Sequence, residues 1–219
     1  MIFVNYKAYE EGIGGKAVAL TKILEEVAHE TQVKIIPVVQ SPDIREVSSS
    51  TTLEVWAQKI DAFEPGAHTG AIVAESVLED GASGTFLNHS EAKFANFDEL
   101  ARASDRAKST GLKTLIFAAN LEELKNVCSL NPNFVAYEPP ELIGSTETSV
   151  AVAKPEIIKD AAEAASAAGI PLIVGAGVHS SDDVKKCLEL GAVGIAVASD
   201  VMKAEDPKRE LADLVSGFQ

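Results

Sequence analysis

Residues 113–137, KTLIFAANLEELKNVCSLNPNFVAY, contain one complete strand–helix–strand unit. The runs Lys113–Ala118 and Phe134–Tyr137 are mostly apolar, as expected for parallel strands that are covered on both faces. The apolar residues between these runs follow the spacing of a helix with one buried stripe, at Leu121, Leu124 and Cys128. Two strands joined by such a helix pair in parallel through a right-handed crossover. The stretch therefore predicts an α/β fold.

The same unit recurs along the whole chain. Strand-like runs are expected at Ile2–Asn5, Lys34–Val39, Glu54–Ala57, Gly84–Leu87, Lys113–Ala118, Phe134–Tyr137, Pro171–Val174 and Val193–Val197. Eight units of roughly 27 residues each favour closure into a (β/α)8 barrel over an open sheet. Because we find no long Pro/Gly/Ser linker, we expect residues 1–219 to form a single barrel domain. The polar stretch Ser48–Thr52 is expected to be a short turn.

Helix boundaries are also visible in the sequence. Ser180 or Ser181 can cap a helix over residues 182–190, and Gly191 can end it in a left-handed turn. Pro155 fits the first turn of the preceding helix, and Gly169 fits the end of that helix. These signals support the strand–helix repeat.

Composition excludes several classes of protein. The chain has 219 residues, of which 46% are hydrophobic and 5% aromatic, so a large core must consist mainly of Val, Ile, Leu and Ala. The 19 basic and 33 acidic residues give a net charge of −14, which argues against binding to nucleic acid or to an anionic membrane surface.

The expected location is the cytoplasm. No apolar run approaches the length of a membrane span, and the start Met1–Asn5 lacks the features of a secretory signal. Cys128 and Cys187 both fall in helical patterns, and we expect them to be free thiols in the core.

Barrel enzymes place their active sites where the strands end and the βα loops begin. After the first strand come Asn5 and Lys7, which point the same way if the segment is extended. After the fourth strand comes His89, followed by Ser90 and Glu91. Backbone N–H groups of a turn at Ser90 and Glu91 would favour a neutral imidazole. A solvated lysine and a structural histidine are the alternative interpretations.

The sixth strand ends in Glu138, followed by Pro139 and Pro140. Apolar surroundings would make this carboxylate a stronger base than a surface glutamate. The two prolines form a stiff hinge, and the apolar stretch Leu142–Gly144 beyond them is typical of a lid. The alternative is a surface loop stiffened by proline.

Small residues follow the last two strands, at Gly175–Val178 and at Ala198 and Ser199. Such loops let the backbone approach an anion, and in this fold they commonly bind phosphate. The sequence has no cluster with metal-ligand spacing and no Walker loop, so we expect neither a metal nor a cofactor. A base, a neutral donor, a cation and a phosphate site together suit proton abstraction next to a carbonyl.

Three motifs carry a resemblance to a known family: Asn5-x-Lys7, Asn88–Glu91 and Ala136–Pro139, in this order on strands one, four and six. Together they resemble the triosephosphate isomerases. The short length, the stretch Pro139–Gly144 and the loop Gly175–Gly177 are similar to the archaeal branch of that family. The resemblance covers the whole chain.

The resemblance implies an isomerase of glycolysis and gluconeogenesis that interconverts dihydroxyacetone phosphate and D-glyceraldehyde 3-phosphate through an enediol(ate). It makes Glu138 the proton-transferring base and neutral His89 the group that polarises the carbonyl. Lys7 would stabilise negative charge, Asn5 would orient the substrate, and Glu91 would lie behind the lysine. The remaining substrate-binding residues implied are Ile143 and Gly144 of the lid, with Gly177, Ala198 and Ser199.

The chain departs from the family in two places. Ala92 and Lys93 stand where the family usually has one or two arginines, so an ion pair there would lack the planar fork of arginine. Ser145–Glu147 replaces a more usual Thr-Gly at the far hinge of the lid. Neither change removes a group from the expected chemistry.

The resemblance also implies a homo-oligomer, either a dimer or a tetramer. Its interface loop would be Gly66–Gly70, with Thr69 approaching Asn5 and Lys7 of the partner subunit. His29 and His179 are expected to be solvated. The alternatives to this function are another phosphate-binding barrel enzyme, such as a sugar-phosphate or indole-pathway isomerase or lyase, and a non-catalytic barrel that binds a partner or senses triose phosphate.

Overall fold

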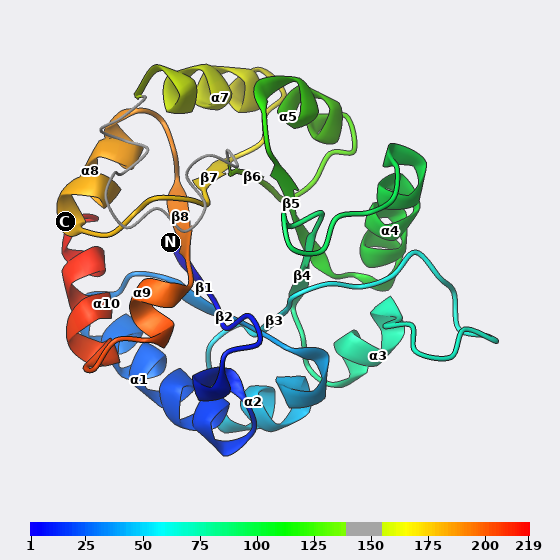
Figure 1. Cartoon of the computed structure of the whole chain (residues 1–219), viewed down its shortest axis with the longest axis horizontal. Helices are drawn as coiled ribbons and strands as arrows, with labels where there is room; N and C mark the ends of the chain where they lie inside the picture. Colours follow the sequence, from blue (N-terminus) through cyan, green and yellow to red (C-terminus); the bar gives the residue numbers. More distant parts are fainter. Residues whose placement is uncertain (139–154) are drawn as a thin grey trace.

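The computed structural model describes residues 1–138 and 155–219 of the chain. Eight parallel strands form a closed barrel in chain order, and β8 pairs with β1 to complete the ring (Figure 1). The strands are β1 (Ile2–Asn5), β2 (Ile35–Val39), β3 (Trp56–Ala57), β4 (Gly84–Leu87), β5 (Lys113–Ala118), β6 (Phe134–Tyr137), β7 (Leu172–Val174) and β8 (Gly194–Val197). The predicted eight-stranded barrel is confirmed.

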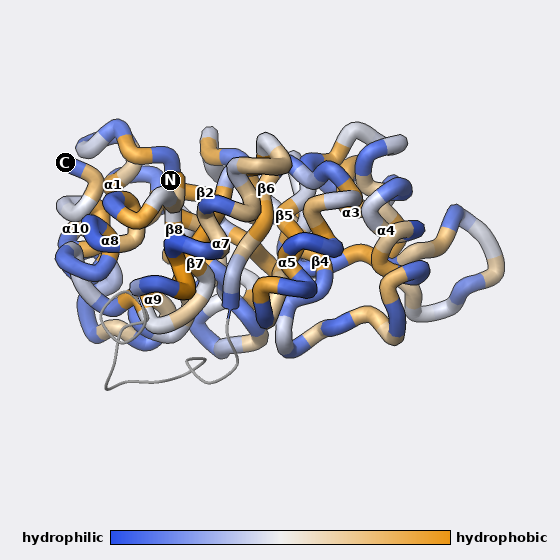
Figure 2. The backbone as a smooth tube through the Cα atoms, turned by 90° about the horizontal axis from the view of Figure 1, so that it is seen from above, coloured by the Kyte–Doolittle hydropathy of each residue, from blue (hydrophilic) through white to orange (hydrophobic). Residues whose placement is uncertain are grey.

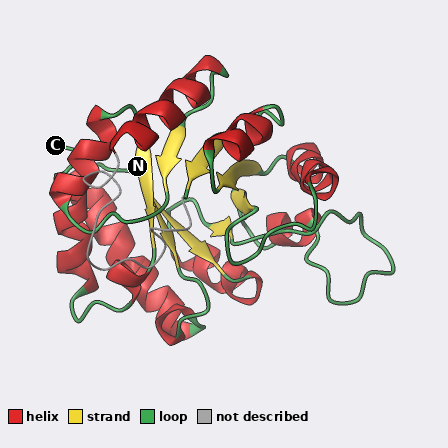
Figure 3. Cartoon of the chain, turned by 45° about the horizontal axis from the view of Figure 1, so that its top comes forward, coloured by secondary structure: helices red, strands yellow, loops and turns green. Residues whose placement is uncertain are grey.

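The helices lie outside the ring of strands (Figure 3). Among the described residues they are α1 (Gly15–Thr31), α2 (Ile44–Ser50), α3 (Ala74–Glu79), α4 (Phe97–Thr110), α5 (Leu121–Cys128), α7 (Pro155–Ala167), α8 (Ser181–Glu189), α9 (Ser199–Met202) and α10 (Pro207–Ser216). Two 3₁₀ turns, Glu10–Gly12 and Ser41–Asp43, precede α1 and α2.

Most predicted element boundaries agree with the structure to within one residue. Four strands match the predicted ranges, and β2, β7 and β8 each begin one residue later. Ser180 caps α8 by accepting a hydrogen bond from the backbone N–H of Asp183. Gly169 and Gly191 follow α7 and α8 with φ values of 71° and 103°, as expected for glycines that end helices.

Two boundary predictions were wrong. The third strand comprises only Trp56 and Ala57, which is shorter than predicted. The residues Ser48–Ser50 belong to the last turn of α2 and are not part of a polar turn. Their hydroxyls donate to backbone oxygens three or four residues earlier in the helix, which lets a serine-rich segment stay helical.

Side chains fill the interior of the barrel, so it is a packed core. Phe3, Trp56 and Phe86 are buried there together with apolar side chains from the other strands. The rings of Phe3 and Trp56 meet edge to face with their centroids 5.0 Å apart. A Cβ on Gly84 would lie only 2.4 Å from the Trp56 ring, so only glycine fits opposite this indole.

A second, larger apolar layer lies between the strands and the helices. Figure 2 shows the strands as mostly hydrophobic segments, with more hydrophilic stretches along the outer helices. Cys128 and Cys187 are buried in this layer as free thiols, as predicted. Within the described part of the chain, we find no helix that is both long and apolar enough to cross a membrane.

The loop between β3 and α3 projects away from the barrel, beyond α3 and α4 (Figure 1). Its base is closed by two hydrogen bonds between Asp61 and Ile72, each 2.8 Å long. The loop includes the predicted interface segment 66–70, and Phe63 stacks on His68 with ring centroids 4.2 Å apart. Internal contacts therefore order this loop where it projects from the barrel.

Candidate active site

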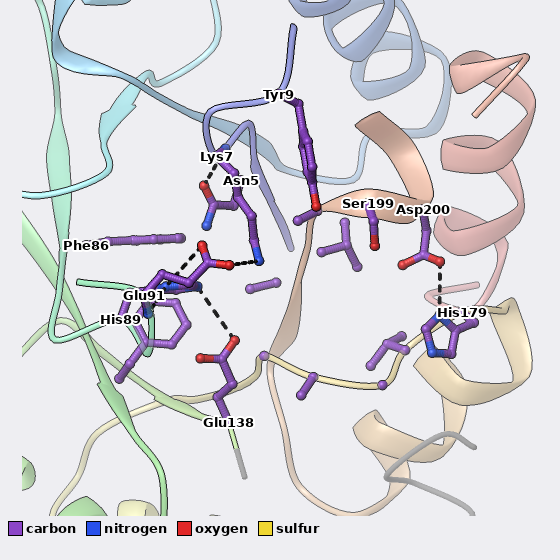
Figure 4. Close-up of a pocket in the computed structure, with 18 residues that line it drawn as sticks. Asn5, Lys7, Tyr9, Phe86, His89, Glu91, Glu138, His179, Ser199 and Asp200 are labelled. Atoms are coloured by element: carbon purple, nitrogen blue, oxygen red, sulfur yellow. Dashed lines mark hydrogen bonds and ion pairs between the residues drawn. The ribbon is translucent and has the colours of Figure 1, made fainter. Parts of the chain in front are cut away.

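A cavity of about 280 Å³ opens at the carboxyl ends of the strands. Figure 4 shows the side chains that line it. Of the residues expected to form the site, the cavity is lined by Asn5, Lys7, His89, Glu91, Glu138, Gly177, Ala198 and Ser199. Ile143, Gly144 and the expected lid lie outside the described residues.

Asn5 and Lys7 enter the cavity from the end of β1. The backbone does not continue as an extended strand, because Lys7 has a φ of 47°. The Lys7 N–H donates to Asn5 Oδ1 at 3.0 Å, and Gln58 Nε2 donates to the Lys7 carbonyl at 2.8 Å. These bonds hold a left-handed conformation that is uncommon for a residue other than glycine. The two side chains therefore share the cavity through a turn, not through strand alternation.

The Lys7 ammonium is held by Glu91. Lys7 Nζ lies 2.8 Å from Glu91 Oε1, and the lysine side chain is only 20% exposed. Glu91 thus lies beside the lysine, which is the position that the resemblance noted in the sequence implies for it. This ion pair fixes the position of the Lys7 ammonium, whereas a fully solvated lysine would be free to move.

His89 follows β4, and its ring is 8% exposed. The backbone N–H of Glu91 donates to His89 Nδ1 at 3.1 Å, so Nδ1 is an acceptor and the ring proton lies on Nε2. Burial lowers the His89 pKa to about 4, with Glu91 opposing this shift and Lys7 adding to it. The imidazole is therefore neutral at pH 7, as the sequence predicts.

Glu138 follows β6, and its side chain is 7% exposed. Burial raises the Glu138 pKa to about 7, while Ser90 and Lys7 favour the charged form and limit the rise. Its Oε1 atom lies 3.7 Å from His89 Nε2 (Figure 4). A buried carboxylate with this pKa can accept a proton near neutral pH.

A polar cluster behind the cavity supports the His89 loop. Asn88 has a φ of 60°, and its Nδ2 donates to the Phe117 carbonyl and to Glu123 Oε1. Lys93 Nζ lies 3.0 and 3.2 Å from the two Glu123 oxygens. Burial opposes ionisation of Glu123, but hydrogen bonds from Ala119, Lys93 and Asn88 hold its pKa below the usual range. Lys93 thus pairs with two oxygens without the fork of an arginine.

Small residues form the other end of the cavity. Gly177, in the loop after β7, has a φ of 63°, a conformation that glycine adopts at little cost. Ala198 and Ser199 follow β8 and line the cavity where α9 begins. Gly177, Ala198 and Ser199 carry no large side chains themselves, so their backbone can approach an anion closely.

Sequence reasoning missed three residues at this end: Tyr9, His179 and Asp200 all line the cavity. The prediction that His179 is solvated was wrong, because its ring is 30% exposed and its Nδ1 lies 3.0 Å from Asp200 Oδ1. The predicted exposure of His29 agrees with the structure. The only sequence signal for the three missed residues was their position within a few residues of a strand end.

The site combines a buried carboxylate, a neutral imidazole and a fixed ammonium around one cavity. This set can move a proton between carbon atoms next to a carbonyl and stabilise the charge that develops on oxygen. Among residues 1–138 and 155–219, no three His, Cys, Asp or Glu side chains are grouped so that they could hold a metal ion.

Comparisons with known proteins agree with this chemistry. The family model described as triosephosphate isomerase matches residues 1–217. A triosephosphate isomerase of Metallosphaera sedula is 41% identical over 99% of this chain and 95% of its own length. One from Sulfurisphaera tokodaii is 42% identical over 98% of this chain and 93% of its own length.

A solved structure shows the same fold. The crystal structure of a triosephosphate isomerase from Bartonella henselae superposes with a TM-score of 0.73. It covers 99% of this chain and 96% of its own chain at 18% sequence identity. At that identity the match supports the barrel architecture and not the roles of individual residues.

Proposed function

The chain belongs to the triosephosphate isomerase family, and we propose that Glu138, His89 and Lys7 carry out its reaction. That reaction interconverts dihydroxyacetone phosphate and D-glyceraldehyde 3-phosphate, a step of glycolysis and gluconeogenesis. The observation that carries the proposal is the 3.7 Å approach of His89 Nε2 to Glu138 Oε1 in one cavity, with the two pKa values shifted in opposite directions.

In the first step, Glu138 removes the proton from the hydroxymethyl carbon of dihydroxyacetone phosphate. The electron pair of that C–H bond forms the C=C bond of an enediolate, and the carbonyl π electrons move onto oxygen. His89 donates a hydrogen bond to this oxygen from Nε2, because Nδ1 is occupied by the Glu91 N–H. The neutral imidazole can act as this donor because its one ring proton lies on Nε2.

In the second step, the C=C electrons take the proton back from Glu138 at the neighbouring carbon. The C1 hydroxyl gives up its proton as its oxygen electrons form the aldehyde C=O, and the C2 oxygen gains a proton, relayed between the two oxygens by His89 Nε2. Throughout both steps Lys7 stabilises the negative charge of the enediolate and of the phosphate. Its ammonium is held at 2.8 Å by Glu91, so little reorganisation is needed when charge develops. Asn5, which accepts the Lys7 N–H, orients the substrate beside it.

The phosphate group is assigned to the end of the cavity formed by Gly177, Ala198 and Ser199. Support comes from the positive φ of Gly177 and from the small side chains there, which leave backbone N–H groups accessible to an anion. The assignment of Ile143 and Gly144 to the same group rests on the sequence alone. We assign the whole chain, residues 1–219, to one barrel domain.

Substitution of Glu138 tests the proposal. The Glu138→Gln variant should lose about 100- to 10,000-fold in kcat for triose phosphate isomerisation, the usual range for a general base. Glu163→Gln is the matched control, because Glu163 lies on α7 with a side chain 69% exposed, and it should retain wild-type activity. Wild-type activity in Glu138→Gln would remove this residue from the reaction.

We also propose that the chain forms a homo-oligomer, a dimer or a tetramer, in the cytoplasm. The loop between β3 and α3 would insert into a neighbouring subunit, with Thr69 near Asn5 and Lys7 of the partner subunit. Support comes from the projection of this loop (Figure 1) and from Phe63, which is 41% exposed.

The proposed compartment is supported by the two free, buried cysteines.

A further inference from the structure

His179 and Asp200 are joined by a hydrogen bond in the cavity wall, at the end away from His89 and Glu138 (Figure 4). His179 lies in the loop after β7, and Asp200 lies in α9, which follows β8. The Nδ1 atom of His179 is 3.0 Å from Oδ1 of Asp200. Neither side chain takes part in the proton transfer described above.

The position of Asp200 is unfavourable for an anion site unless a hydrogen-bond donor holds its carboxylate. It follows Ser199 directly in the chain, and its side chain lines the same cavity as Gly177 and Ala198. A free carboxylate within a few ångströms of a bound phosphate would repel it, and this repulsion is weakly screened in a partly buried cavity. Some group must therefore compensate Asp200 if phosphate is to bind here.

The neighbouring helices add negative charge and do not supply the compensation. The carboxylate of Asp183 on α8 accepts the backbone N–H of His179 at 3.0 Å. Glu210 on α10 has a raised pKa, first because of burial and then because of repulsion from Asp200 and Asp213, with Arg209 and His179 opposing the rise. Lys203 on α9 lies instead over the Tyr9 ring, with its Nζ 4.5 Å from the centroid. Among the side chains that the structure describes, the hydrogen bond to the Asp200 carboxylate comes from His179.

We propose that His179 is a positioning residue for phosphate binding. Its Nδ1–H donates a hydrogen bond to the Asp200 carboxylate and so holds that carboxylate against the imidazole. The backbone N–H groups of the two small-residue loops then face a phosphate without a competing anion beside them. The inference rests on the proposed function, which assigns the phosphate to this end of the cavity.

The inference makes a prediction that differs in sign between the two residues. Removing only His179 leaves Asp200 uncompensated and weakens anion binding. Removing only Asp200 eliminates the repulsion and leaves binding equal to that of the wild type or tighter. Removing both leaves no carboxylate to repel the anion, so the second substitution should reverse the effect of the first. A pair that served only to hold the two loops together would show no such reversal.

The experiment measures KM for the triose phosphates and the competitive inhibition constant of inorganic sulfate at pH 7. It uses the wild type, His179→Gln, Asp200→Asn and the double variant. We expect His179→Gln to raise both constants about tenfold, as for a partly screened like-charge contact, with a smaller change in kcat. Both constants should return to the wild-type value or below it in the double variant.

Matched controls are His29→Gln on α1 and Asp105→Asn on α4, because both residues are exposed. Neither control should change the two constants. The inference is overturned if His179→Gln leaves them unchanged, or if the double variant binds as weakly as His179→Gln. If sulfate fails to compete with substrate in the wild type, the anion site itself is absent and the proposed function fails together with the inference. Competition of equal strength in the wild type and the three pair variants would overturn only the role of His179.

Discussion

The Nε2 atom of His89 lies 3.7 Å from the Oε1 atom of Glu138, across the ends of β4 and β6. Both groups are buried, and burial acts on them in opposite ways. It disfavours the imidazolium of His89 and the carboxylate of Glu138, so that one pKa falls to about 4 and the other rises to about 7. The same environment therefore produces a neutral donor and a strong base.

The pH dependence of turnover should report this base. As the pH falls through about 7, Glu138 in the free enzyme takes up a proton, and kcat/KM should decline in proportion to the loss of carboxylate. Protonation of His89 should cause no further decline in kcat/KM until the pH approaches 4. The measurement is kcat/KM between pH 5 and 9. The substrate phosphate titrates near pH 6, below the expected limb, and a profile that stays flat down to that pH would contradict the assignment.

The raised pKa of Glu138 also predicts that this residue destabilises the fold at high pH. Its pKa is about 7 in the folded chain against an ordinary value of 4.5, so the folded state binds the proton more tightly than the unfolded state does. The stability that comes from this tighter proton binding is fully present below pH 4.5. It is lost as the pH rises to about 7, where the buried carboxyl group becomes charged.

The variant Glu138→Gln removes this effect. The free energy of unfolding of Glu138→Gln minus that of the wild type should be about 1–3 kcal/mol larger at pH 8 than at pH 4.5. Urea unfolding of both proteins at the two pH values measures the difference. If the two proteins differ by the same free energy of unfolding at both pH values, burial does not disfavour the charged form of Glu138.

Much of this arrangement was predictable from the sequence, and for local reasons. The strands are short apolar runs. Asn5 ends β1, His89 comes two residues after β4, and Glu138 directly follows β6. The rule that barrel active sites form at the carboxyl ends of the strands therefore places all three around one cavity. The left-handed turn at Lys7 was not predictable, because it depends on bonds to Asn5 and to Gln58, which is far away in the chain.

The polar end of the cavity was missed for a related reason. His179 and Asp200 are 21 positions apart, and no periodic pattern links them. They meet only because β7 and β8 are neighbours in the closed barrel. The serines of α2 were misjudged because their hydroxyls bond back to the helix, an effect that composition does not reveal.

The loop that carries His89 depends on the conformation of Asn88. Asn88→Ala should destabilise the fold by about 1–3 kcal/mol, because it removes three side-chain hydrogen bonds from a buried site. Asn88→Gly loses the same bonds but tolerates the φ of 60°, so it should be about 1 kcal/mol more stable than the alanine variant. Chemical denaturation of both variants checks the order, and a more stable alanine variant would show that the φ angle is not a constraint.

The projecting loop should mediate self-association through Phe63. Phe63→Ser removes an exposed aromatic ring from the stack with His68 and should shift the assembly towards smaller species. Val193→Ser is the control, because Val193 is similarly exposed, at 42%, directly before β8. Sedimentation velocity at several protein concentrations measures the change. Equal sedimentation of the wild type and both variants would argue against this loop as the interface.

The central claim is that Glu138 carries the proton between the two carbons. The most direct measurement is the rate at which deuterium from D₂O enters dihydroxyacetone phosphate, followed by NMR in wild type and Glu138→Gln. A carboxylate that has taken the substrate proton can exchange it with solvent before returning it, so the wild type should incorporate deuterium during turnover. The glutamine variant should incorporate deuterium at least about 100-fold more slowly than the wild type, whereas incorporation at the wild-type rate would show that another group moves the proton.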